Sequence, residues 1–167
     1  MSDLADLLER LRRGAEIVAV AITGAAGAEL DFHPGEKAWS IREIICHLAD
    51  SETAVAMRMR QVISEDNPQM PAWDQDAWTK SLGYEKRKIS DAMETFRRLR
   101  ADNYELLKNQ PEAAFSRTGI HSERGVITLR DLLQGTAEHA ESHVGQIQRT
   151  RAAYREHKAK LAASKPA

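Results

Sequence analysis

Three of the six histidines in this chain have the spacing of a metal-binding site. His139 and His143 stand four residues apart in a segment with the apolar periodicity of a helix. That spacing places two side chains on one helix face, one turn apart. His47 lies in another segment of helical periodicity and could supply a third ring from a neighbouring helix. Three imidazoles leave one position of a metal ion open to water or substrate, which is the arrangement of a reactive centre.

Four segments have apolar residues at intervals of three and four, the pattern that predicts amphipathic helices. We place these helices at about residues 2–23, 40–64, 84–109 and 128–157. Ser40 with Glu43, and Thr128 with Asp131, predict a capping box at the start of two of them. The segments between show no strand-length alternation of apolar and polar residues. The pattern therefore predicts an all-α, four-helix bundle with left-handed, near-antiparallel packing.

The connections between the helices are long. Residues 65–83 contain Trp73 and Trp78, and we expect them to form a loop that packs on the bundle. Residues 1–157 form a single domain in this interpretation. Residues 158–167 are expected to be a frayed tail.

The helical wheel places all three histidines near the core. At 100° per residue, His143 lies within about 30° of the centre of its apolar stripe and His139 about 70° from it. His47 lies about 100° from Leu48, at the flank of its own stripe. The rings could therefore line a cleft at a seam between helices. The alternative is that each is a local imidazole bonded to backbone or carboxylate, because a short motif also occurs by chance.

Two further residues could support such a site. Glu52 belongs to the apolar stripe of the 40–64 segment, and a buried carboxylate needs a partner. It could accept the second ring N–H of a metal-bound histidine, or form an ion pair with an arginine of a facing helix. His121 lies in the loop before the last helix and could approach the cleft.

Other polar side chains are expected to be uninvolved. Cys46 falls nearly opposite the apolar stripe of its helix, so we expect no nucleophilic role for it. Asp50 points outward on the wheel, as a surface carboxylate would. His33 and His157 lie in a loop and near the tail, where solvent should surround them.

Composition excludes several classes of function. The chain has 167 residues and a net charge of −1 with the signs interspersed, which argues against nucleic acid as a partner. It has one cysteine, so it has no internal disulfide and no thiolate zinc site. No apolar run has the length of a membrane span, and the N-terminus lacks a signal pattern. We expect a cytoplasmic protein with a small-molecule substrate.

Three segments together resemble the DinB-like family, of the YfiT type. They are WSIREIICHLADSE at residues 39–52, DQDAW at 74–78 followed by LGY at 82–84, and HSERGVITLRDLL at 121–133 running into EHAESHVGQI at 138–147. The resemblance implies a four-helix bundle that binds a divalent metal, often nickel or zinc, through three histidines. These match His47, His139 and His143. It further implies hydrolase activity or a thiol-dependent transfer that uses a low-molecular-weight thiol, and a homodimer.

The expected function is therefore that of a metal-dependent enzyme with an open coordination position. Such an ion lowers the pKa of bound water to about 7, or binds a thiol as the thiolate. The first property predicts a hydrolase and the second a thiol-dependent transferase. Zinc, nickel and iron all suit imidazole ligands, whereas Mg²⁺ and Ca²⁺ prefer oxygen. The alternative is a non-catalytic metal-binding or interaction module.

Overall fold

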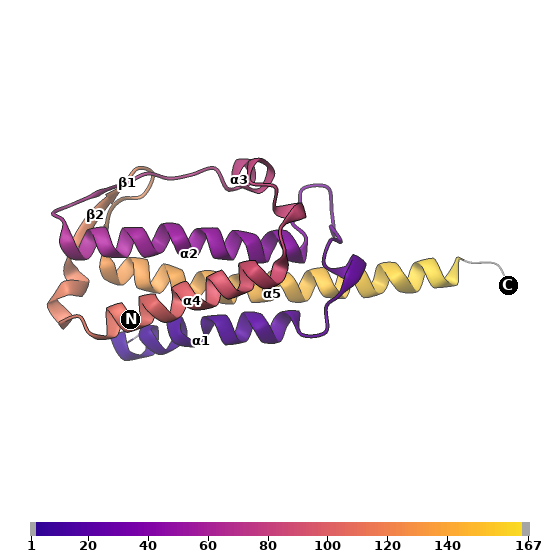
Figure 1. Cartoon of the computed structure of the whole chain (residues 1–167), viewed down its shortest axis with the longest axis horizontal. Coiled ribbons are helices and arrows are strands. Elements are labelled where there is room, and N and C mark those ends of the chain that lie inside the picture. The colour runs from indigo at the N-terminus through magenta and orange to yellow at the C-terminus, as the bar shows by residue number, and fades with distance from the viewer. Residues whose placement is uncertain (1–2, 165–167) are drawn as a thin grey trace.

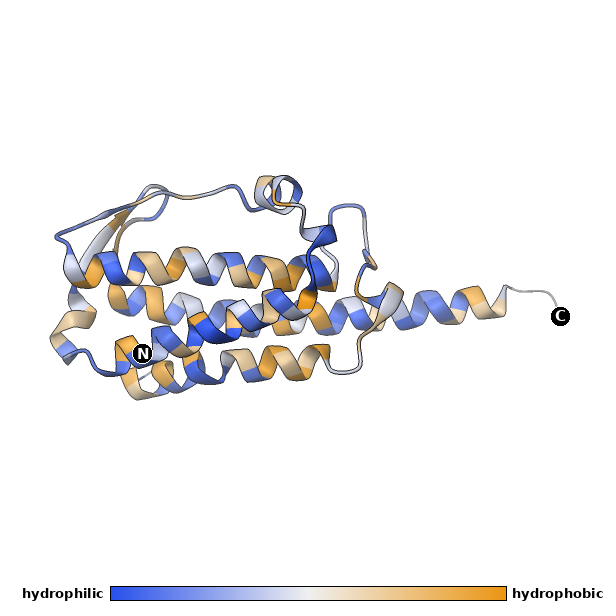
Figure 2. Cartoon of the chain, viewed as in Figure 1, coloured by the Kyte–Doolittle hydropathy of each residue, from blue (hydrophilic) through white to orange (hydrophobic). Residues whose placement is uncertain are grey.

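Four long helices lie side by side in the computed structural model, which describes residues 3–164 (Figure 1). They are α1 (Leu4–Ile22), α2 (Ile41–Ser64), α4 (Ile89–Lys108) and α5 (Leu129–Ala163). Figure 2 shows polar and apolar residues alternating along each of them, as amphipathic helices require. The predicted four-helix bundle is confirmed.

Both predicted capping boxes are present. The Glu43 N–H donates to Ser40 Oγ at 3.3 Å, and the Ser40 N–H donates to the Glu43 carboxylate at 2.7 Å. Thr128 and Asp131 exchange the equivalent bonds, at 3.0 and 2.8 Å. Each box satisfies backbone donors that the first turn of a helix otherwise leaves unpaired. The local sequence therefore fixes where α2 and α5 begin.

The third long helix begins later than expected. α4 starts at Ile89, while Tyr84–Lys86 forms a short 3₁₀ turn. Arg87 between them has an extended backbone, with φ −76° and ψ 144°. Its carbonyl accepts from Arg42 at 2.9 Å and its side chain pairs with Asp50 at 2.8 Å. Both bonds run to α2, so tertiary contacts interrupt the helical pattern here.

The helices do not simply alternate in direction. α1 and α5 run one way along the bundle and α2 and α4 run the other (Figure 1). Antiparallel packing, as predicted, describes the pairs α2–α5 and α1–α4, whereas α2–α4 and α1–α5 are parallel neighbours. Parallel neighbours need a connection that returns along the bundle. Residues 65–88, which include α3 (Gln75–Ser81), make that return over α2.

A small sheet contradicts the expectation that the chain has no strands. β1 (Gln69–Met70) pairs in parallel with β2 (Thr118–His121), which pairs antiparallel with β3 (Gly125–Thr128). Strands of two to four residues are too short to show a period of two in the sequence. Gly125 turns the β2–β3 hairpin with φ +70°. The sheet joins the return crossover to the segment that leads into α5.

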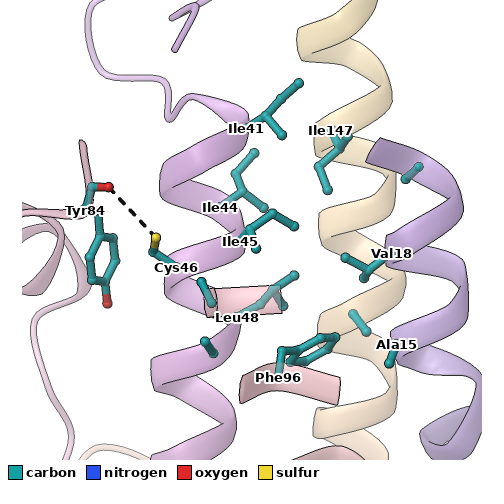
Figure 3. Packing of buried hydrophobic residues seen from close by; sticks show 14 residues of the cluster. Ala15, Val18, Ile41, Ile44, Ile45, Cys46, Leu48, Tyr84, Phe96 and Ile147 are labelled. Carbon is teal, nitrogen blue, oxygen red and sulfur yellow. Dashed lines mark hydrogen bonds between the residues drawn. The ribbon is translucent and has the colours of Figure 1, made fainter. Parts of the chain in front are cut away.

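Cys46 is buried, although it falls nearly opposite the apolar stripe of α2. Figure 3 shows Ile44, Ile45 and Leu48 of α2 packed toward Phe96 and Ile147, while Cys46 points the other way toward Tyr84. The Cys46 Sγ lies 3.9 Å from the Tyr84 carbonyl oxygen. Burial raises the pKa of the Cys46 thiol to about 11. The return crossover covers this second face of α2, and the wheel of a single helix cannot predict that cover.

The expected tail is largely helical. α5 continues through Ala163, and its last turns project beyond the other helices with exposed side chains (Figure 1). Residues 165–167 of the predicted tail lie outside the described residues. Among residues 3–164, no helix has the length and apolar character needed to cross a bilayer.

Candidate metal centre

The antiparallel packing of α2 on α5 brings the three histidines together. His47 Nε2 lies 3.0 Å from His139 Nε2, which lies 3.0 Å from His143 Nε2. One nitrogen of each ring falls within 4.8 Å of the other two. Among the described residues, this is the cluster of potential ligands whose donor atoms converge in this way. The structure thus unites the three predicted ligands.

The spacing of the nitrogens suits one shared cation. A transition metal binds imidazole nitrogen at about 2.1 Å, which places adjacent ligand nitrogens about 3.0–3.4 Å apart. Hydrogen bonding explains the same contacts poorly. His139 Nε2 faces two nitrogens at 3.0 Å, yet one ring nitrogen carries either a single proton or a single lone pair. The donor set therefore fits a divalent transition metal.

Neighbouring polar groups favour the ring tautomer that a metal needs. His143 Nδ1 lies 2.8 Å from Gln146 Oε1, so Nδ1 carries the proton and donates it. The lone pair of His143 then lies on Nε2, the nitrogen that faces the other two rings. Ser51 Oγ lies 3.3–3.4 Å from the ring nitrogens of His47, one turn along α2.

Burial keeps the three rings neutral. His47 is 2% exposed, and desolvation, followed by the charge of His143, lowers its pKa to about 3. Desolvation also lowers the pKa of His139 to about 3, and it lowers the pKa of His143. Neutral imidazole is the form that binds metal. The three rings therefore have the protonation state that metal binding requires at neutral pH.

Trp39 is part of the site and was not predicted to be. Its ring centroid lies 4.7 Å from that of His47 and 6.3 Å from that of His143, nearly parallel to the latter. Its indole N–H donates to Asp76 of α3 at 3.2 Å. Trp39 directly precedes Ser40, the N-cap of α2. Its ring covers one side of the histidines and excludes water there.

A cavity of about 190 Å³ opens beside His139. Its walls come from α2, α5, the return crossover and the β2–β3 turn, and they include Ser51, Arg58, Trp73, Arg124 and His139. A larger hollow of about 590 Å³ between α1 and α5 is lined by none of the three histidines. The smaller cavity is thus the one from which a ligand could reach the cluster.

Glu52 forms an ion pair with an arginine of a facing helix, which is one of the two alternatives that the sequence left open. Its carboxylate accepts from Arg100 Nη2 at 3.0 Å and Nε at 3.2 Å, and from Asn103 Nδ2 at 2.9 Å. Both charged side chains are at most 2% exposed. Arg100 also donates to the Thr136 carbonyl at 2.8 Å. Glu52 therefore connects α2 to α4, and none of these bonds reaches a histidine.

His121 does not join the cluster. Its Nδ1 accepts the backbone N–H groups of Glu123 and Arg124 at 3.2 and 3.3 Å, so these bonds stay within the β2–β3 turn. Burial, followed by the charges of Arg58 and Arg124, lowers the pKa of His121. A supporting role for its ring is a prediction that these contacts do not favour.

The remaining polar residues lie away from the cluster. His33 is exposed and lies 2.7 Å from Glu43, and His157 is exposed beside the ring of Phe32. Asp50 is half-buried in its ion pair with Arg87, so the expectation of a surface carboxylate is wrong for it. The crossover that covers Cys46 also supplies Arg87.

Comparison with known proteins points to one family. The DinB superfamily matches residues 7–147. A protein of Halalkalibacterium halodurans named "Putative metal-dependent hydrolase BH0277" is 27% identical over 68% of this chain and just under two thirds, 66%, of its own length. "Putative metal-dependent hydrolase YfiT" of Bacillus subtilis is 23% identical over 76% of this chain and 72% of its own.

Two solved structures share the fold. That of YfiT from Bacillus subtilis, described as a probable metal-dependent hydrolase with an unusual four-helix bundle topology, has a TM-score of 0.82 at 21% identity and covers 87% of this chain and 84% of its own. That of a mycothiol-dependent maleylpyruvate isomerase has a TM-score of 0.71 at 15% identity, over 87% of this chain and 61% of its own. At these identities the likeness shows the bundle alone.

Proposed function

The chain belongs to the DinB superfamily, and on this premise we propose that it is a metal-dependent enzyme. His47, His139 and His143 hold one divalent transition metal ion, of zinc, nickel or iron. The observation that carries the proposal is the convergence of three imidazole nitrogens from two helices. The names of the relatives in Halalkalibacterium and Bacillus support it. The cavity beside His139 is where a small-molecule substrate would enter.

The residues around the cavity favour thiol-dependent transfer over hydrolysis. The bound ion would either activate water or hold a thiol as the thiolate. Activating water is helped by a carboxylate that can take a proton. Glu52, the buried carboxylate of the cavity, already accepts three N–H bonds from Arg100 and Asn103. Asp131, the other carboxylate of the cavity, accepts the capping bonds of Thr128. Both carboxylates are therefore already engaged, and this favours the thiol-dependent reaction.

In the transfer that we propose, a sulfur–carbon bond forms to an electrophilic substrate. The leaving group departs with the electron pair of the bond that breaks, and the thiol proton passes to solvent. The neutral histidines supply ligands, Gln146 holds the ring of His143 by its bond to Nδ1, and Trp39 keeps water from one side. Hydrolysis is the second candidate, because the relatives are named as hydrolases.

Metal analysis of protein purified without a nickel column or a histidine tag tests the site. We expect one metal ion per chain in the wild type and loss of that metal in His143→Ala, since three ligands become two. His157→Ala is the matched control, because this histidine is exposed and lies on the same helix. Stoichiometric metal in His143→Ala, or its equal loss in His157→Ala, would remove the site.

The reaction class needs a separate assay. Metal-loaded protein is offered a small thiol with an electrophile in one reaction, and simple esters in the other. Conjugation that requires both metal and His143 supports the transferase, and ester cleavage with the same requirements supports the hydrolase. Tight metal binding with neither reaction would favour the non-catalytic module. The expected homodimer stays a prediction, which sedimentation of the loaded protein would check.

A further inference from the structure

Arg58 of α2 is a buried cation without a carboxylate partner. It is 8% exposed, and its Nη2 donates to the Pro71 carbonyl. Its guanidinium carbon lies 4.5 Å from the ring centroid of Trp73. No ion pair among residues 3–164 includes Arg58, and within that range its Nε and Nη1 donate no hydrogen bond. Arg100, the other deeply buried arginine discussed above, is paired with Glu52.

Such a residue is unusual, because a buried charge is costly unless it is paired. Arg58 lines the same cavity as His139, and its Nε and Nη1 are not among the fully buried unpaired atoms of the described residues, so they stay open to a ligand. Stacking on Trp73 and the bond to Pro71 hold the plane of the guanidinium in place. One N–H of Nη2 is used by Pro71, and the second N–H of Nη2 together with Nε or Nη1 makes the planar pair of donors that binds an oxyanion.

A second cation lines the same cavity. Arg124 lies in the β2–β3 turn and is exposed. After burial, its charge is the second cause that lowers the pKa of Arg58. The carboxylates that line the cavity are already engaged, Glu52 with Arg100 and Asp131 with the cap of α5. The charge of Arg124 also acts on Asp131 and lowers the pKa of that carboxyl, so Arg58 is the cation of this cavity that has no carboxylate partner.

We propose that Arg58 and Arg124 form an oxyanion subsite beside the three-histidine centre. A carboxylate or sulfonate-like group of the substrate or thiol binds there, while the reacting end of the same molecule lies at His139. This inference rests on the proposed function and narrows its substrate class to anionic small molecules. The cavity of about 190 Å³ admits a short molecule that spans both ends.

Binding of a graded series of thiols tests the subsite. The probes are mercaptocarboxylates with one to five methylene groups, mercaptoalcohols of matching length, and mercaptosulfonates with two and three methylene groups. Isothermal titration of metal-loaded protein measures each affinity. At the length that spans the cavity, we expect the anionic thiol to bind roughly tenfold to a hundredfold more tightly than the alcohol. Comparing carboxylate with sulfonate at equal length identifies the preferred oxyanion.

Two substitutions separate the subsite from the rest of the fold. Arg58→Met keeps the packed stem and removes the charge, and Arg124→Gln changes an exposed residue whose loss should not affect folding. Each is expected to reduce the preference for the anionic thiol and to leave the affinity of the mercaptoalcohol unchanged. Arg155→Gln, an exposed arginine of α5 outside this cavity, is the matched control.

The outcomes distinguish the two proposals. If mercaptoalcohols bind and no anionic thiol binds more tightly, the subsite is wrong and the metal centre stands. If Arg124→Gln and a folded Arg58→Met both retain the full preference, the subsite is also wrong. If no thiol binds to metal-loaded protein but carboxylates without a thiol group bind in a way that requires Arg58, the subsite stands and the thiol-dependent function fails.

Discussion

Replacing Arg100 with methionine would leave the carboxylate of Glu52 unpaired in the middle of the bundle. The two side chains are 1% and 2% exposed, so solvent cannot replace the lost partner. Breaking a buried ion pair from one side costs about 3–5 kcal/mol. A domain of this size loses about 2–4 °C in midpoint per kcal/mol, so we expect a shift of roughly 6–20 °C.

Urea denaturation of metal-free protein is the assay, because bound metal would add its own stabilisation. The double variant Glu52→Leu/Arg100→Met removes both charges and fills similar volume. We expect it to be more stable than Arg100→Met alone, since no charge remains buried. Arg98→Met is the control on the same helix. Its side chain is 75% exposed, and its free energy of unfolding should change by less than about 0.5 kcal/mol.

Two results would refute this reasoning. One is an Arg100→Met variant whose free energy of unfolding lies within about 1 kcal/mol of the wild type, which is too little for a buried unpaired charge. The other is a double variant whose loss of unfolding free energy equals the sum of the losses in Glu52→Leu and Arg100→Met. Additive losses would mean that the two residues do not interact.

Further predictions concern two glycines and the acid stability of metal-free protein. Gly14→Ala should destabilise the protein, because the added Cβ would lie 1.8 Å from Arg100 Nη1. Gly135→Ala should stabilise it by up to about 1 kcal/mol, because its added Cβ would meet no neighbouring side chain within 4 Å. Equal urea midpoints for the two variants would contradict the clash at Gly14. The pKa values of His47 and His139 lie near 3, below the usual 6.5, so the unfolded chain binds protons first as the pH falls. The contribution of these two rings to the free energy of unfolding of metal-free protein is therefore fully present above about pH 6.5 and is lost toward pH 3. At pH 5 the loss is about 2 kcal/mol per ring. A His47→Gln/His139→Gln variant that loses as much stability between pH 7 and pH 5 would show that these rings are not the cause.

The helices of this protein are largely a property of local sequence. Apolar spacing and the capping boxes at Ser40 and Thr128 use contacts within three or four residues, and the structure has both boxes. The paired strands and the late start of α4 depend on distant partners. Gln69 pairs with Ile120, and Arg87 bonds to α2. Local patterns carry no information about such partners.

The relative directions of the helices also could not be predicted from the sequence. Four amphipathic stripes are compatible with several orders of packing, because each stripe says only that one face is buried. The parallel pairs α2–α4 and α1–α5 follow from a long return crossover over α2. The same crossover buries Cys46 on a face that the helical wheel assigns to solvent. A wheel describes one helix and not what covers it.

The sequence by itself determined that His139 and His143 share a face, since helical geometry fixes residues four apart. Only the tertiary structure decided that His47 meets them, because the meeting depends on the register of α2 against α5. It also decided that Glu52 pairs with Arg100 while Arg58 in the same cavity has no carboxylate. Which charges compensate each other is set by distances through space, and these emerge only when the helices pack.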